Sequence, residues 1–179
     1  RRQRQMCIRD RIRTVDITVT AAMAALVFLG TYIFKIPTIS GYVHLGDCMI
    51  LLTVALFGMK KGAIAGAIGG GLSDFIGGYF YWVVPTLLIK CMWAIVMGLI
   101  MHKVLKDKKG SFLIGAIAGG VLHIIAYTLV RVVLYGGKTA IIEIPALAFQ
   151  TGAGIVIGFV IYMLLKKSGV AGRLSGMVK

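Results

Sequence analysis

The chain has 179 residues, of which 59% are hydrophobic and only 15% are charged, and its mean hydropathy is +0.92. A soluble domain usually carries about a quarter charged residues, so this composition excludes an ordinary soluble protein. The net charge of +14 raises nucleic acid as a partner, but the sequence contains no aromatic–basic platform and no RNA-binding signature. The basic residues lie instead at the ends of apolar segments, where they orient a membrane protein.

The chain begins with a basic arm, residues 1–14, followed by an apolar segment of membrane length. Because no small-residue cleavage site follows the arm, we expect it to be cytoplasmic rather than a signal peptide. Residues 15–167 are predicted to form one transmembrane domain. Residues 168–179 are predicted to be a basic cytoplasmic tail.

The hydropathy pattern predicts an all-α membrane protein with six transmembrane helices. A helix that crosses about 30 Å of hydrocarbon needs about 20 residues. Two further apolar segments are shorter or rich in glycine, and a turn at residues 58–62 separates them. In chain order, the predicted helices are residues 17–36, 49–59, 63–80, 83–101, 112–135 and 141–165.

The short second helix implies that residues 37–47, which precede it, dip into the membrane. Non-helical backbone at that depth requires a covering of protein or a water-filled cavity. This segment is therefore the first indication of a pocket.

Basic residues predict the orientation. With six helices, the four most basic segments fall on one side of the membrane: residues 1–13, 60–61, 103–109 and 166–179. The positive-inside rule makes that side cytoplasmic. Both termini are therefore expected on the cytoplasmic side of a prokaryotic plasma membrane. Three loops then face outward, at residues 35–47, 77–84 and 135–141.

Polar side chains gather in these outer loops and in the outer halves of the helices. An ionisable group within a membrane costs about 2.5–3.5 kcal/mol on insertion scales and usually faces an interior cavity. Helical spacing places His123, Tyr127 and Arg131 on one stripe. The candidate substrate-binding residues are Tyr42, His44, Asp47, Asp74, Tyr79, Trp82, Lys90, Trp93, His123, Tyr127, Arg131, Glu143 and Gln150.

Each of these residues also has a structural interpretation. Lys90 can pair with Asp74 as a structural ion pair. Arg131 can extend to the membrane interface, and His123 can be a packing histidine. Aromatic side chains near the outer surface can anchor the protein in the interface, as in Tyr79, Tyr81 and Trp82.

The sequence indicates a protein without catalytic or metal chemistry of its own. The three cysteines are isolated, and the three histidines form no HxxxH pair. Residues 136–139, GGKT, imitate the end of a P-loop but lack its first glycine. Without a nucleophile–base pair or an ATP motif, energy for transport must come from another subunit or from an ion gradient.

The first helix carries a small-residue motif. Ala21 and Ala25 are four residues apart and share a face, which permits close approach of another helix. That helix can belong to this chain or to another protein. The candidate docking residues are Ala21, Ala22, Ala24 and Ala25.

Several motifs together resemble the S components of energy-coupling-factor (ECF) transporters. They are the alanines at 21 and 25, His44-Leu45-Gly46-Asp47, and Ser73-Asp74-Phe75-Ile76-Gly77-Gly78-Tyr79 followed by Pro85-Thr86-Leu87-Leu88-Ile89-Lys90. The two segments 73–79 and 85–90 are similar to those of the riboflavin-type branch of this family. That branch also includes proteins linked to hydroxymethylpyrimidine or pyridoxine. The resemblance covers residues 15–167.

The resemblance implies that the chain captures a vitamin between its helices and outer loops. It also implies docking through Ala21 and Ala25 onto a membrane T subunit, with two cytoplasmic ATPases that use ATP. Two alternatives from the residues alone stay open. One is a non-transport membrane scaffold or assembly protein, and the other is a solitary ion-coupled carrier.

Overall fold

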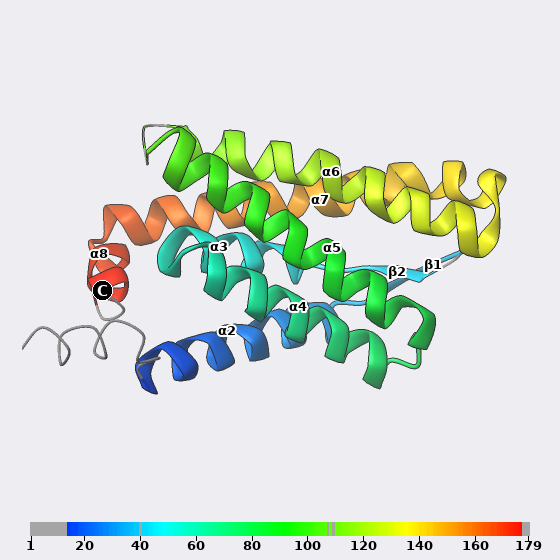
Figure 1. The fold of residues 1–179 in the computed structure, drawn as a ribbon, viewed down its shortest axis with the longest axis horizontal. Coiled ribbons are helices and arrows are strands. Elements are labelled where there is room, and N and C mark those ends of the chain that lie inside the picture. The colour runs from blue at the N-terminus through cyan, green and yellow to red at the C-terminus, as the bar shows by residue number, and fades with distance from the viewer. Residues whose placement is uncertain (1–13, 40, 107, 109, 177–179) are drawn as a thin grey trace, which may run out of the picture.

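The computed structural model describes residues 14–39, 41–106, 108 and 110–176, and these residues form an elongated helical bundle (Figure 1). The predicted basic arm lies outside the described residues except for Thr14, which begins the first helix. The α-helices are α2 (Thr14–Tyr32), α3 (Asp47–Phe57), α4 (Met59–Ile76), α5 (Phe80–Gly98), α6 (Ser111–Tyr135), α7 (Gly137–Lys167) and α8 (Val170–Gly176). A π-helical segment, η1 (Leu99–Val104), continues α5.

Each of the six predicted segments overlaps one of the helices α2 to α7. Four stretches are long and apolar enough to cross a membrane: α2, α5 with η1, α6 and α7. α4 has 18 residues but contains three charges, those of Lys60, Lys61 and Asp74. α3 has 11 residues and spans about 16 Å at 1.5 Å per residue.

The short helix α3 is the centre of the bundle. It packs against α2, α4, α5 and α7. Ile50, Leu51 and Val54 are fully buried as a result. These side chains meet Met97, Met101, Phe112 and Ala116 in an apolar core. An apolar helix can be this short because other helices, rather than lipid, surround it.

The connection before α3 is non-helical, as predicted, and contains regular structure. It is an antiparallel hairpin of β1 (Ile36–Thr38) and β2 (Gly41–Val43), in which Pro37 lies opposite Tyr42. The predicted all-α architecture is confirmed, and this hairpin adds one small sheet to it among the described residues. Figure 1 shows the hairpin at the same end of the bundle as the α6–α7 junction, with α8 at the opposite end.

Several predicted boundaries also shift. The first helix ends at Tyr32 rather than at residue 36, because Ile36 already pairs in the sheet. The turn predicted at 58–62 contracts to Gly58, whose φ of 91° favours glycine. The fourth predicted helix continues to Val104 through η1, and the sixth begins at Gly137. The predicted tail contains α8.

Candidate functional site

A narrow cavity lies beneath the hairpin. Its empty space is about 430 Å³, including space at its open mouth. Five helices, the strand β2 and the connection after β2 contribute to its wall. The lining residues are Thr31, Gly41, Tyr42, His44, Asp74, Trp82, Thr86, Tyr127, Arg131, Leu147 and Gln150.

Helical spacing explains how neighbouring wall residues reach the same cavity. Trp82 and Thr86 are four residues apart on α5, as are Tyr127 and Arg131 on α6. Residues four apart lie on one helical face, one turn above the other. Each helix therefore presents an aromatic or polar pair to the cavity.

Aromatic rings form one wall. The Trp82 ring stacks on Tyr127, with centroids 5.6 Å apart, and on Tyr135, with centroids 6.1 Å apart. The Trp82 indole nitrogen also donates a hydrogen bond of 3.1 Å to the Tyr135 hydroxyl. The Arg131 guanidinium carbon lies 5.4 Å from the centre of the Trp82 ring. These contacts hold both Trp82 and Arg131 in fixed positions.

Polar contacts attach the hairpin to the helix ends. The Tyr42 hydroxyl donates to the Asp74 carboxylate on α4. Thr38 donates to Glu143 on α7 over 3.0 Å, and the Lys35 ammonium donates to the Ser73 carbonyl oxygen over 3.1 Å. The hairpin is thus fastened on two sides of the cavity.

Burial changes the acid–base properties of this covering segment. It raises the pKa of Tyr42 well above the ordinary value, and the nearby Asp74 carboxylate adds to that rise. Tyr42 therefore stays a neutral hydrogen-bond donor at physiological pH. Burial also lowers the pKa of Lys35, while the attraction of Asp74 opposes that change.

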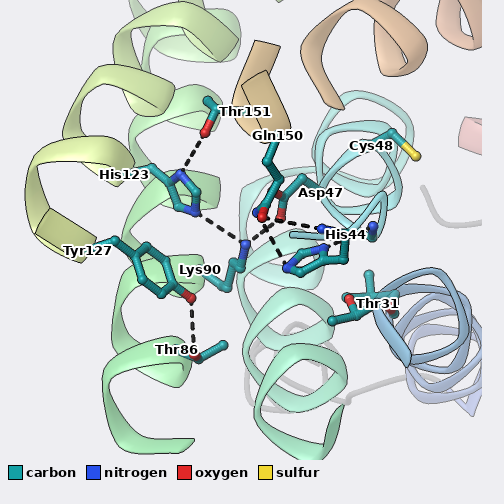
Figure 2. A network of polar contacts seen from close by, with 12 residues as sticks. Thr31, His44, Asp47, Cys48, Thr86, Lys90, His123, Tyr127, Gln150 and Thr151 are labelled. Carbon is teal, nitrogen blue, oxygen red and sulfur yellow. Dashed lines mark hydrogen bonds and ion pairs between the residues drawn. The ribbon is translucent and has the colours of Figure 1, made fainter. Parts of the chain in front are cut away.

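A buried charged network, called the floor here, adjoins the cavity wall through Gln150 (Figure 2). Lys90 of α5 forms a buried ion pair with Asp47 at the start of α3. The Lys90 ammonium also lies 3.2 Å from Nε2 of His123. An ammonium only donates, so this ring nitrogen accepts, and Nδ1 carries the proton toward Thr151 at 3.1 Å. His123 is accordingly neutral.

Gln150 joins the floor to the connection that precedes α3. Its amide nitrogen donates to the Asp47 carboxylate over 2.7 Å, and its amide oxygen accepts from the His44 backbone N–H over 3.3 Å. Nδ1 of His44 accepts from the Gly46 N–H over 3.1 Å. Burial lowers the pKa of His44 to about 3, so its ring is uncharged.

Close contact between α2 and the start of α3 closes one side of the site. A Cβ atom added at Gly46 would lie 2.0 Å from the Thr31 hydroxyl oxygen and 2.9 Å from the Val27 carbonyl oxygen. Only glycine fits there. The Thr31 hydroxyl donates to that same Val27 oxygen.

The predicted site residues fall into two groups. Those that line the cavity are Tyr42, His44, Asp74, Trp82, Tyr127, Arg131 and Gln150. The others lie outside the cavity wall and, apart from Tyr79, are buried: Asp47, Lys90, Trp93, His123 and Glu143. Tyr79 packs against the Tyr42 ring, with centroids 5.0 Å apart. Trp93 donates to the Ala116 carbonyl oxygen and lies in the apolar core.

The structure agrees with some of the structural alternatives given for these residues and disagrees with others. The partner of Lys90 in the ion pair is Asp47 and not Asp74. Arg131 is 5% exposed and pairs with Glu143 at 3.4 Å, so it does not extend to the interface. Tyr81 is 83% exposed, in keeping with an anchoring role.

Four lining residues were not among the predicted substrate-binding residues: Thr31, Gly41, Thr86 and Leu147. Helical spacing in the sequence could have predicted two of them. Thr86 lies four residues before Lys90, and Leu147 lies between Glu143 and Gln150 on the same helical face. No sequence pattern could have predicted Thr31 or Gly41. The contact of α2 with the start of α3 places Thr31 at the cavity, and the hairpin places Gly41 there.

A separate groove runs along α2 and α4. Ala21, Ala24 and Ala25 line it from α2, while Ile64 and Ile68 line it from α4. Ala21, Ala22 and Ala25 are exposed, whereas Ala24 is buried against α4, where its carbonyl oxygen faces Gly69. Near the start of α2, Lys61 pairs with Asp16 at 3.2 Å.

The site provides hydrogen bonds and aromatic faces, which suit binding rather than catalysis. Within residues 14–39, 41–106, 108 and 110–176, no three His, Cys, Asp or Glu side chains gather as metal ligands. The arrangement can hold a small ring compound by stacking and hydrogen bonding.

Known proteins resemble this chain over most of its length. The model of the family described as ECF-type riboflavin transporter, S component, matches residues 11–167, which include every helix from α2 to α7. An "Uncharacterized protein in gap 3'region" of Pyrococcus woesei is 36% identical over 132 residues, or 74% of this chain and 87% of that protein. The chain therefore belongs to the S components of ECF transporters, the membrane subunits that bind the substrate in vitamin uptake.

Proposed function

We propose that this chain captures a small planar vitamin or vitamin precursor from outside the cell, in the cavity beneath the hairpin. The setting of the cavity carries the proposal. Aromatic and polar side chains line it at one end of the bundle, and an apolar core fills the bundle below. A pocket with aromatic faces and a few polar groups suits a small ring compound. A continuous channel would need polar groups throughout its length.

The orientation follows from the distribution of basic residues on the six helices α2 to α7. Lys60, Lys61, Lys103, Lys166 and Lys167 lie at helix ends that are opposite to the hairpin. The positive-inside rule assigns that end to the cytoplasm. In this topology all six helices belong to the membrane domain, α3 as a short central one. Both termini are inside, and the hairpin covers the cavity on the outer face.

Three kinds of solute are candidates: riboflavin, a hydroxymethylpyrimidine and pyridoxine. Each has a planar ring with polar substituents, as the cavity wall requires. The description of the matched family favours riboflavin. The name of the Pyrococcus woesei relative gives no substrate.

Delivery to the cytoplasm requires the rest of the transporter. The groove between α2 and α4 presents Ala21 and Ala25, whose small side chains permit a partner helix to approach. We infer that this face docks on the membrane T subunit. Two ATPase subunits then supply the energy by hydrolysing ATP.

The test is binding by the purified full-length chain in detergent, without ATP and without partner subunits. Riboflavin, hydroxymethylpyrimidine and pyridoxine are titrated by calorimetry, and each is tested for a shift in melting temperature. At least one should bind with nanomolar to micromolar affinity. Tyr127→Ala should weaken that binding, whereas Tyr81→Ala, at an exposed tyrosine, should leave it unchanged.

Other results would favour other functions. If no solute binds, the chain is better explained as a membrane scaffold or assembly protein whose polar groups are structural. If liposomes that contain this chain alone accumulate the solute along an ion gradient, it is a solitary carrier.

A further inference from the structure

Arg131 differs from the other polar residues that line the cavity. Among the described residues, its Nε and Nη1 atoms have no hydrogen-bond partner, although the side chain is only 5% exposed. Its remaining nitrogen, Nη2, lies 3.4 Å from Glu143. Burying guanidinium N–H groups without an acceptor costs free energy, so the fold retains donors that it does not itself use.

The other polar groups of the wall are bonded within the protein. The hydroxyl of Thr31 donates to Val27, and that of Tyr42 donates to Asp74. The Tyr127 hydroxyl donates to Thr86 over 3.0 Å. Gln150 uses its amide oxygen and nitrogen on His44 and Asp47. Arg131, which also lines the cavity, therefore keeps N–H groups that no other described residue uses.

The charges around the cavity are matched. Lys90 pairs with Asp47, and Arg131 pairs with Glu143. Lys35 interacts electrostatically with Asp74. A charged solute would disturb this balance among buried side chains, and an unmatched buried charge is costly. The balance favours an uncharged solute.

The position of Arg131 is fixed before any solute binds. Its guanidinium lies over the Trp82 ring, which itself contacts the rings of Tyr127 and Tyr135. A planar guanidinium held in this way presents its N–H groups in fixed directions, which suits a carbonyl oxygen on a ring. Tyr42, Trp82 and Tyr127 supply aromatic faces along the same cavity.

We propose that Arg131 is the specificity-determining donor of the site, and that it selects an uncharged planar ring with a carbonyl group. This inference rests on the proposed function. It adds the residue that recognises the solute, Arg131, and the chemical group that this residue recognises, a ring carbonyl. The Arg131–Glu143 pair provides the charge balance, and the unpartnered N–H groups provide the hydrogen bonds.

The test compares three probes on the full-length protein in detergent. Lumichrome is an uncharged tricyclic ring with carbonyl groups, phenazine is a similar ring without them, and thiamine is a cation. Wild-type protein should bind lumichrome at least about tenfold more tightly than phenazine, as expected for a hydrogen bond to a charged donor. Thiamine should bind more weakly than lumichrome.

Arg131→Met should remove the preference for lumichrome over phenazine, because both rings then meet only apolar and aromatic surface. Lys138→Met, at an exposed cation of α7, should preserve the preference. Arg131→Met leaves Glu143 without this cation and can unfold the protein, so Arg131→Lys is the second variant. It keeps the charge but replaces the planar array of N–H donors by one flexible ammonium, so it should also reduce the preference.

The possible contrary results distinguish failure of this inference from failure of the proposed function. If a vitamin binds but lumichrome does not, or if Arg131→Lys retains the full preference, the inference is wrong and the proposed function stands. Tighter binding of thiamine than of lumichrome would also overturn the inference. If neither the vitamins nor lumichrome bind to wild-type protein, the proposed function fails together with it.

Discussion

The Tyr42 hydroxyl donates a hydrogen bond to the Asp74 carboxylate and thereby ties the hairpin to the end of α4. The two residues are 32 positions apart in the chain, and both line the cavity. A solute in the cavity therefore meets both residues in its wall. An isolated two-stranded hairpin is only marginally stable, so the hairpin is the part of the wall that we expect to move.

The first prediction concerns this contact. Tyr42→Phe removes the hydroxyl but keeps the ring, so the hairpin should open more often. Amide hydrogen exchange in residues 36–43 should accelerate, and a bound vitamin should dissociate about tenfold faster, as expected when a hydrogen bond to a charged group is lost. Tyr81→Phe, at an exposed position, is the control. Equal exchange rates in the two variants would argue against a fastening role.

The second prediction concerns the ion pair in the floor. Lys90 is 1% exposed and Asp47 is fully buried. Lys90→Met leaves a buried carboxylate without its cation, which typically costs about 3–5 kcal/mol. Thermal melting in detergent should show a large loss of stability. The double variant Lys90→Met with Asp47→Leu should recover part of it, because both charges are then absent.

Lys138→Met is the matched control for that experiment, since it removes an exposed lysine near the same end of the bundle. It should melt at the wild-type temperature. If Lys90→Met is as stable as this control, the ion pair does not hold α5 to α3.

The third prediction tests the close contact of α2 with the start of α3. Gly46→Ala places a methyl group 2.0 Å from the Thr31 hydroxyl oxygen, so the helices must separate. Overpacking of this kind costs about 1–3 kcal/mol and should lower the melting temperature. Gly152→Ala on α7 is the control, because an added Cβ there meets no atom within 4 Å. A wild-type melting temperature for Gly46→Ala would show that the contact relaxes easily.

The sequence predicted the helices well because hydropathy and length report directly on membrane-spanning segments. It also indicated buried positions for Lys90 and Arg131, since a charge within an apolar helix is costly unless it faces the interior. The helical stripe of His123, Tyr127 and Arg131 is observed as three buried side chains on one face of α6.

Helical spacing in the sequence could not predict which carboxylate pairs with Lys90. The sequence places Asp47 and Asp74 in neighbouring parts of the predicted bundle, and Lys90 is within a plausible distance of either in a schematic bundle. The rotation of α3 and α4 about their axes decides between them, and it depends on side-chain packing. The strands were equally hidden, because three residues with a proline among them are too few to show an alternating pattern.

The last prediction concerns docking. Ala21 and Ala25 are exposed on α2 and line the groove shared with α4. Ala21→Trp with Ala25→Trp should fill the groove and prevent a partner helix from approaching. Uptake of the vitamin by cells that express the whole transporter should then cease, while binding by the purified chain should be unchanged, because the cavity lies at the hairpin end. Leu26→Trp enlarges another exposed side chain of the same helix, outside the groove lining, and should preserve uptake. Normal uptake by the double tryptophan variant would mean that the T subunit contacts a different face.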